Sequence, residues 1–163
     1  MSKRNLRTAM GAVAAMLLTA CSTMNCPLNN TVRAHYQLYG KVDTLKDSLT
    51  ITALSEIDGS DPVVLNLKTD VKNFWTPMSF KADKDVLLFD LKSKDGYESK
   101  DTVEISKTNE PHFEDVDCGT SFFHKITGVS WTRNAIDSIV INNPNVNYDE
   151  EKVHFRIYFK LHD

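Results

Sequence analysis

The chain has 163 residues, of which 41% are hydrophobic and 25% charged, with only 6 glycines and 5 prolines. These fractions are ordinary for a globular protein and exclude collagen-like, low-complexity and disordered chains. The length fits one domain with a well-buried core. A formal net charge of −3 argues against nucleic acid as a partner.

The first twenty residues have the order of a signal peptide. Three basic residues open the chain: Lys3, Arg4 and Arg7. The apolar segment that follows, residues 8–18, is too short to span a bilayer of roughly 30 Å as a helix. It runs into Leu18-Thr19-Ala20-Cys21, which resembles the bacterial lipobox, although a buried amphipathic helix is the alternative. The resemblance implies cleavage before Cys21, with acyl chains such as palmitate on its sulfur and new amino terminus as a firm anchor.

This interpretation divides the chain into a signal peptide (1–20), a lipidated tether (21–30) and a single domain (31–163). Cleavage removes three basic residues and no acidic one, so the mature chain carries a formal charge of −6. Anionic headgroups repel such a chain, which favours a domain held away from the membrane on its tether.

Two further cysteines, Cys26 and Cys118, remain in the mature chain. An exported chain meets an oxidising compartment, and two cysteines have only one possible pairing. The bridge would close a loop of about 90 residues and contribute roughly 4 to 5 kcal/mol by chain-entropy reasoning. The alternative is that Cys118 is a catalytic thiol near His112 or His124, but no recognisable His–Asn spacing accompanies it.

Apolar residues recur with period two, which predicts β-strands rather than helices. The alternation is clearest near the two ends of the domain, with apolar residues at Val32, Ala34, Tyr36 and Leu38 and again at Val153, Phe155, Ile157, Phe159 and Leu161. Between them lie six shorter runs rich in β-branched and aromatic residues. These runs are 48–54, 63–67, 86–91, 102–106, 121–129 and 136–141.

Turn residues separate these runs. Asp95-Gly96 predicts a hairpin in which both central residues have positive φ, and residues 58–62 and 142–145 are two further turns. About eight strands at this spacing predict an all-β fold, an antiparallel β-sandwich of immunoglobulin-like architecture. A small barrel is the alternative.

The densest acidic stretch runs from His112 to Cys118. On a strand Asp115 and Asp117 share one face, where two carboxylates could ligate Ca²⁺; apart from this candidate ion we expect no cofactor. A solvated acidic edge that deters sheet-to-sheet aggregation is the alternative. Zinc held by His112 and His124 would lack a third ligand at a familiar spacing.

Neither a nucleophile elbow nor a zinc-protease, phosphate-loop or nucleotide motif occurs, so we expect no enzyme activity. Trp75 and Trp131 stand beside turn or strand-end residues, where exposed indoles could stack on the rings of a sugar. The alternative is that both indoles cap the core, because large aromatic side chains usually bury most of their surface.

A triplet of Asp, then Ser or Thr, then an aliphatic residue occurs four times. Its hydroxyl residues are Thr44, Ser48, Thr102 and Ser138. The triplet resembles the O-glycosylation sequon of exported Bacteroidetes proteins. Three of the four stand at an expected strand entry, where Asp and Ser or Thr are common in any case.

Three parts of the domain resemble a known family. They are residues 102–113 (TVEISKTNEPHF), Asp117-Cys118-Gly119 with Phe122-Phe123-His124, and residues 135–144 (AIDSIVINNP) with the closing 154–159. The family is an uncharacterised one of small Bacteroidetes lipoproteins, a domain of unknown function of which some members are labelled calcium-binding. The resemblance covers nearly the whole mature chain and implies an envelope location but no mechanism.

The same resemblance indicates on which side of the outer membrane the lipoprotein lies. Surface lipoproteins of that phylum carry acidic residues just after the lipidated cysteine, whereas here Ser22-Thr23-Met24-Asn25 follows Cys21. Ser22 also differs from the Asp that retains lipoproteins at the inner membrane. The periplasmic face of the outer membrane is therefore implied, with surface display as the alternative.

We expect a non-enzymatic structural or protein-interaction module of the cell envelope. Its docking surface would be the basic outer face of the last strand, formed by His154, Arg156 and Lys160. The alternative is a module that binds a glycan or Ca²⁺ through Trp75, Trp131 and the acidic stretch.

Overall fold

The computed structural model describes residues 31–55, 59–115 and 118–161. The expected signal peptide, Cys21, the tether with Cys26, and Asp117 lie outside these residues. The described residues hold no α-helix, and hence none long and apolar enough to cross a membrane.

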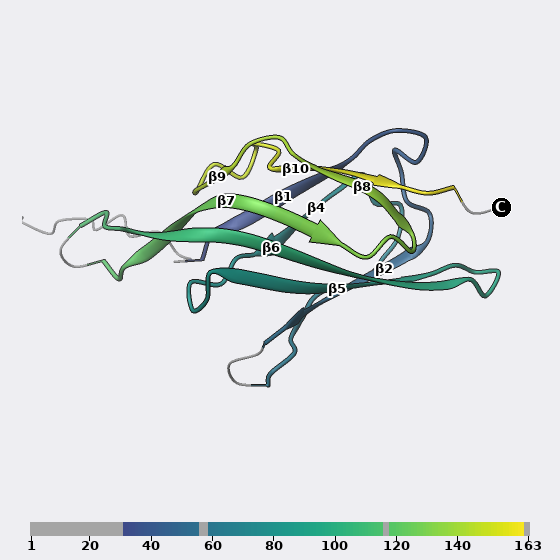
Figure 1. The fold of residues 1–163 in the computed structure, drawn as a ribbon, viewed down its shortest axis with the longest axis horizontal. Helices are drawn as coiled ribbons and strands as arrows, with labels where there is room; N and C mark the ends of the chain where they lie inside the picture. Colours follow the sequence, from purple (N-terminus) through teal and green to yellow (C-terminus); the bar gives the residue numbers. More distant parts are fainter. Residues whose placement is uncertain (1–30, 56–58, 116–117, 162–163) are drawn as a thin grey trace, which may run out of the picture.

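The described part of the chain contains ten strands. They are β1 (Arg33–Leu38), β2 (Ser48–Leu54), β3 (Val63–Lys68), β4 (Asn73–Pro77), β5 (Lys84–Lys92), β6 (Glu98–His112), β7 (Ser121–Trp131), β8 (Ile136–Ile141), β9 (Asn145–Val146) and β10 (Phe155–Phe159). They form a four-stranded sheet, β4-β1-β10-β8, and a six-stranded sheet, β3-β2-β5-β6-β7-β9. The predicted all-β sandwich is therefore confirmed, although β1 and β10 pair in parallel (Figure 1).

Alternation along the strands builds the core between the sheets. Val32, Ala34, Tyr36 and Leu38 are all buried, as expected. The Tyr36 ring stacks between Phe74 and Phe155, with ring centroids 4.7 Å apart in both pairs. The core thus joins β1, β4 and β10 through aromatic contacts.

A bulge in β7 changes which residues face the core. The pairing with β6 passes from Gly128 opposite Ser106 to Ile126 opposite Lys107, so that Thr127 is passed over. Val129 packs against the core on one side of this bulge, whereas Ile126 and His124 are buried on the other. One extra residue thereby shifts the inward positions from odd to even numbers.

The hairpin at Asp95-Gly96 exists, but its predicted turn geometry is wrong. Five residues, 93–97, join Lys92 to its partner Glu98. Gly96 has φ +89°, whereas Asp95 has no positive φ. The Ser93 hydroxyl accepts from the amides of Asp95 and Tyr97, so this longer connection needs only one left-handed residue.

Several strand boundaries differ from those expected. The runs 48–54 and 136–141 are β2 and β8 as predicted, whereas 102–106 is only the middle of the fifteen-residue β6. β4 and β9 were not expected. The idea that Asp-Ser/Thr triplets mark strand starts holds for Ser48 alone, because Thr102 and Ser138 lie inside β6 and β8.

The predicted basic face of the last strand also needs correction. β10 ends at Phe159, Leu161 is exposed, and His154 is fully buried just before the strand begins. The backbone amide of His35 donates to Nδ1 of His154 over 2.9 Å, which holds the ring against β1. Only Arg156 and Lys160 of the three basic residues are exposed.

A buried carboxylate fixes the connection from β7 to β8. The side chain of Asp101, on β6, accepts from the Thr132 hydroxyl and from the amides of Asn134, Ala135 and Ile136, at 2.8 to 2.9 Å. The crossing between the two sheets therefore depends on one fully buried side chain.

We predict that Asp101→Ala lowers the free energy of unfolding by about 2 to 4 kcal/mol, because it leaves the buried amides of Ala135 and Ile136 without an acceptor. Urea unfolding followed by tryptophan fluorescence measures the change. Asp137→Ala, at an exposed position, is the matched control and should change stability by less than about 0.5 kcal/mol. Equal effects of the two substitutions would contradict this role of Asp101.

Candidate functional site

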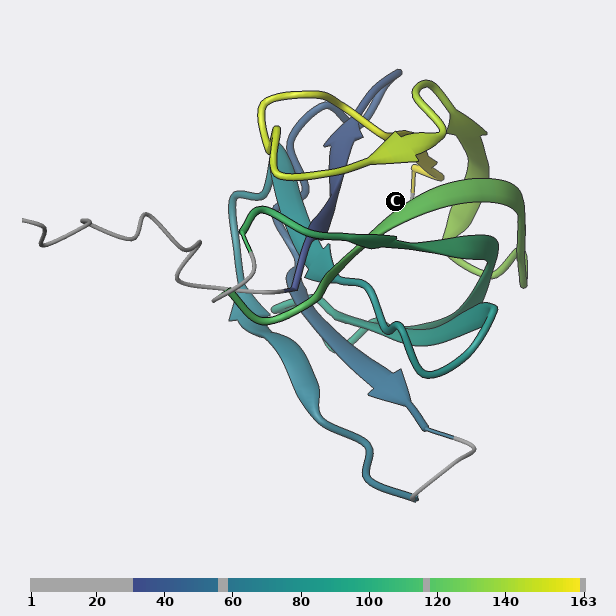
Figure 2. The same ribbon diagram turned by 90° about the vertical axis from the view of Figure 1, so that its left-hand side faces the viewer.

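An apolar pocket of about 360 Å³ opens where the two sheets meet at one end of the sandwich. One wall is the end of β2 and the start of β3, including Ala53 and Val64. The other wall is the β4–β5 connection from Met78 to Ala82, with the start of β5. Figure 2 shows the β2–β3 hairpin projecting beyond the body of the domain beside this connection. The pocket therefore lies between a projecting hairpin and a loop.

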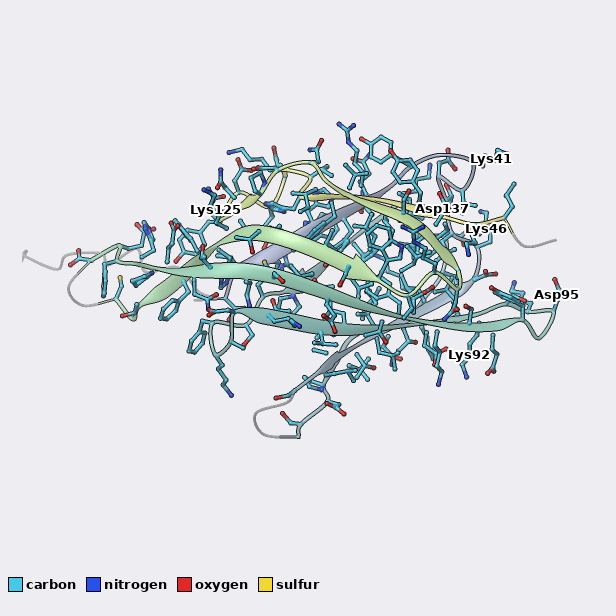
Figure 3. All side chains as sticks on the ribbon, viewed as in Figure 1. Lys41, Lys46, Lys92, Asp95, Lys125 and Asp137 are labelled. Carbon is cyan, nitrogen blue, oxygen red and sulfur yellow. The ribbon has the colours of Figure 1, made fainter. Side chains whose placement is uncertain are left out.

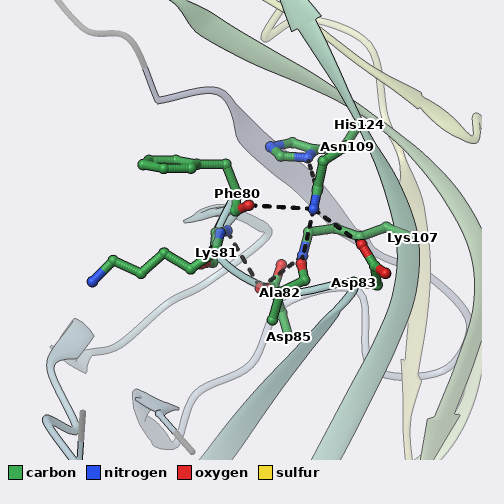
Figure 4. A network of polar contacts seen from close by, with 9 residues as sticks. Phe80, Lys81, Ala82, Asp83, Asp85, Lys107, Asn109 and His124 are labelled. Atoms are coloured by element: carbon green, nitrogen blue, oxygen red, sulfur yellow. Dashed lines mark hydrogen bonds and ion pairs between the residues drawn. The ribbon is translucent and has the colours of Figure 1, made fainter. Parts of the chain in front are cut away.

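A buried lysine holds the loop wall in place. The Lys107 side chain has no exposed surface, and its ammonium donates to the Ala82 carbonyl at 2.8 Å and to Asp85 Oδ1 at 3.0 Å. The Lys107 amide also donates to the Asp83 carbonyl. Because a buried ammonium is costly without partners, these contacts pin the connection to the inner face of β6 (Figure 4).

The next inward residue of β6 extends this network. Asn109 donates from Nδ2 to the Ala82 carbonyl at 3.0 Å, and its Oδ1 lies 2.8 Å from Nδ1 of His124 on β7. The amide side chain can thus accept from a protonated Nδ1 while it holds the loop. Lys107, Asn109 and His124 fix the loop wall from two strands.

Burial controls the charges in this network. Desolvation, with a smaller contribution from the Lys107 charge, lowers the pKa of His124 to about 4, so the imidazole is neutral at pH 7. Desolvation raises the pKa of Asp85, and the ammonium of Lys107 opposes that shift. Asp85 lines the pocket with a side chain only 9% exposed, and its buried Oδ2 has no hydrogen-bond partner among the described residues.

The structure does not bring the two tryptophans together. Trp75 lies on the outer face of the four-stranded sheet, stacked on His35 at 4.5 Å, and donates from Nε1 to the Glu150 carbonyl at 3.0 Å. Trp131, at the end of β7, packs against the core with the Arg133 guanidinium 5.6 Å from its ring centroid. Both indoles are half-buried, and neither lines the pocket.

The acidic stretch lies at the tip of the β6–β7 hairpin. Asp115 is exposed, while its expected partner Asp117 lies outside the described residues. His112 stacks on Phe123 at 4.0 Å and contacts Glu114, whereas His124 belongs to the opposite face of the hairpin, so the two histidines do not converge. Among the described residues, no three His, Cys, Asp or Glu side chains group closely enough to hold a metal.

The four glycosylation candidates are all partly exposed. Thr44 and Ser138 donate to the side chains of the preceding aspartates. The aspartate before Thr102 is Asp101, which is fully buried and already bonded to the β7–β8 connection. Modification of these residues stays a prediction.

Sequence reasoning missed the residues that shape the pocket. Lys107 occupies the same phase as Val103 and Ile105, and its charge at an inward position was the available signal. The charge of Lys107 could be recognised as buried only if β6 was known to continue past Ser106, where the alternation of apolar residues stops. Phe80, in the pocket lining, belongs to a loop and carried no periodic signal.

Comparison with known protein families gives a match over most of the domain. The model of a family described as "Family of unknown function (DUF6452)" matches residues 48–159, the span from β2 to β10. No curated protein and no solved structure matches the chain. The expected membership in a family of unknown function is therefore confirmed at that level.

We predict that Lys107→Met destabilises the protein by about 3 to 5 kcal/mol, because it leaves the carboxylate of Asp85 buried without a counter-charge. The double variant Lys107→Met/Asp85→Leu should be more stable than the single one. Urea unfolding of the parent, both single variants and the double variant measures the coupling. Additive effects would show that the two side chains do not act as a pair.

We also predict that the stability contribution of His124 depends on pH. Its pKa is about 4 in the folded protein and near 6.5 when unfolded, so between these values the unfolded chain binds more protons. The free energy of unfolding therefore falls as the pH is lowered from 6.5 to 4. His124→Gln, which can keep the bond to Asn109, should flatten part of this slope in thermal unfolding at several pH values.

The remaining slope should come from His35 and His154, because burial lowers their pKa values too. Protonation of Asp85, whose pKa is raised, acts in the opposite direction. A slope unchanged by His124→Gln would contradict the neutral, buried state of His124.

Proposed function

The chain belongs to this family of unknown function, and because membership supplies no activity, we propose from its own residues that it is a non-enzymatic, lipid-anchored protein of the cell envelope. In this proposal the domain binds an apolar segment of another envelope protein. The pocket beside the β4–β5 connection is the observation that carries it.

The anchor rests on the sequence. The basic start, the short apolar segment and the Leu18-Thr19-Ala20-Cys21 motif support cleavage and lipidation at Cys21. The resemblance to Bacteroidetes lipoproteins and the tether that follows Cys21 favour the periplasmic face of the outer membrane, with surface display second.

The Cys26–Cys118 bridge is part of the same proposal. Cys118 belongs to the described residues and Cys26 does not, so the bridge itself stays a prediction. Thr31, five residues after Cys26, pairs with Phe122, four residues after Cys118. This pairing supports the bridge because it brings the two segments of chain close together.

The pocket favours an apolar side chain as its ligand. Its lining combines Ala53, Val64 and Met78 with Phe80, and a volume of about 360 Å³ suits one or two large side chains rather than a folded domain. In that lining the Ala82 carbonyl and Asp85 Oδ1 are already bonded to the Lys107 ammonium, which supports binding rather than chemistry. An extended peptide with a protruding aromatic or aliphatic residue fits this description.

A glycan is the second candidate, at a different surface. On the outer face of the four-stranded sheet the rings of Tyr39 and Tyr158 lie 6.2 Å apart, and the Arg156 guanidinium is 5.1 Å from the Tyr39 ring centroid. Gly40, at φ +89°, packs so closely under Tyr158 that a Cβ would come within 2.9 Å of the ring. Aromatic rings beside a guanidinium can bind a sugar, and this surface includes Arg156 of the docking face expected from the sequence.

We predict that Val64→Trp, which fills the pocket, abolishes binding of peptides selected for affinity to the mature protein in lipid nanodiscs. Peptides selected from a displayed random library should share a large apolar residue and bind Val64→Trp at least tenfold more weakly. The matched control is Val63→Trp, at the exposed neighbouring position outside the pocket, which should bind them as the parent does. Both variants should keep the parent melting temperature.

Peptides that bind Val64→Trp as tightly as the parent would contradict the pocket as the binding site. If an oligosaccharide panel binds instead and Tyr158→Ala removes that binding, the glycan reading replaces the proposal. A melting temperature raised by Ca²⁺ and restored by EDTA would favour the calcium alternative.

A further inference from the structure

Three phenylalanines gather near the tip of the β6–β7 hairpin, and we call Phe80, Phe113 and Phe122 the phenylalanine patch. Phe80 stacks on Phe122 with ring centroids 4.8 Å apart, yet 53% of Phe80 remains exposed. Phe113 directly follows β6 and is 67% exposed. Apolar rings with this much exposure at one end mark an interaction surface.

The chain enters the domain at this patch. Thr31, the first described residue, pairs in parallel with Phe122 itself. The opposite end of the molecule is charged: Lys41, Lys46, Lys92 and Asp95 surround it in Figure 3. Exposed phenylalanine rings therefore distinguish the end at which the described part of the chain begins.

The short tether limits the distance between the phenylalanine patch and the bilayer. Ten residues from Cys21 to Thr31 reach at most ~36 Å when fully extended. If Cys26 is bridged to Cys118, only five residues separate the lipidated cysteine from the hairpin tip, a reach of ~18 Å. Cys118 is then held close to that range of the lipidated cysteine, and Phe113 lies five residues before Cys118 on the same tip.

We propose that the phenylalanine patch seats in the headgroup region of the bilayer, so that the β6–β7 tip faces the membrane and the β5–β6 hairpin points away from it. This inference rests on the proposed lipid anchor. It replaces the expectation that the mature charge of −6 holds the domain clear of the surface. Aromatic side chains are favoured at membrane interfaces, and a lipid anchor that already holds them there removes most of the entropic cost of insertion.

The charges near the patch specify the kind of lipid. Glu110, Glu114 and Asp115 are all exposed on the same tip. Anionic headgroups would repel these carboxylates, whereas zwitterionic headgroups would not. The surface we infer is therefore zwitterionic, such as one rich in phosphatidylethanolamine or phosphatidylcholine.

Quenching by brominated lipid tests this orientation. The lipidated full-length variant Phe113→Trp is placed in vesicles of phosphatidylcholine and phosphatidylethanolamine, with and without dibrominated phosphatidylcholine. We expect the fluorescence added by the new tryptophan to fall at least twofold with brominated lipid. Asp95→Trp, at the tip of the opposite hairpin, is the matched control, and its added fluorescence should not change.

Flotation of the same vesicles tests the lipid anchor separately from the orientation of the domain. Protein that floats but shows equal quenching at positions 95 and 113 overturns the orientation and leaves the anchor intact. Protein that does not float overturns the anchor, and the orientation with it. Replacing part of the phosphatidylcholine with phosphatidylglycerol should weaken quenching at position 113, and stronger quenching would contradict the zwitterionic assignment.

Discussion

The shape of the pocket and the position of Phe80 both depend on the buried ammonium of Lys107. A charge with no exposed surface must be fully partnered, and its partners, Asp85 and the Ala82 carbonyl, belong to the β4–β5 connection. That requirement fixes the loop, and the loop forms one wall of the pocket and carries Phe80 toward Phe122. One electrostatic constraint thus shapes both proposed contact surfaces. It also requires a neutral His124 beside it.

Several edge strands of the two sheets are poorly suited to pairing with another chain, which favours contacts through the ends of the sandwich. β3 has irregular pairing and a left-handed Leu67 at φ +45°, β4 ends in Pro77, and β9 has only two residues. Bulges, prolines and short strands discourage the pairing of an edge with another chain. The pocket and the phenylalanine patch share Phe80, and Thr31 of the pocket lining pairs with Phe122 of the patch. The pocket therefore opens at the end that we place near the membrane. A partner held at the same membrane would meet it there.

The sequence was sufficient where one strand face is apolar and the other polar. Residues 48–54 satisfy that condition, and their boundaries were predicted correctly. The boundaries of 136–141 were also correct, but they follow from β-branched residues between turns, because the apolar residues of this strand do not alternate and Val140 is exposed. It failed where polar residues face inward. β6 continues through Lys107 and Asn109 only because a loop more than twenty residues earlier supplies their partners, a tertiary contact that no local period reveals. His154 is buried for the same reason, against His35. The pocket, made by loop placement, was not predictable.

The central claim is that a short, bridged tether holds the phenylalanine patch against the membrane. Mass spectrometry of the mature protein, digested without reduction, tests it most directly. The account predicts an acylated peptide that begins at Cys21 and a disulfide linking Cys26 to Cys118. With trypsin the first two cysteines stay on one fragment, so the linked species should carry both the lipid and the hairpin tip. An unmodified Cys21, or Cys26 recovered as a free thiol, would contradict the account.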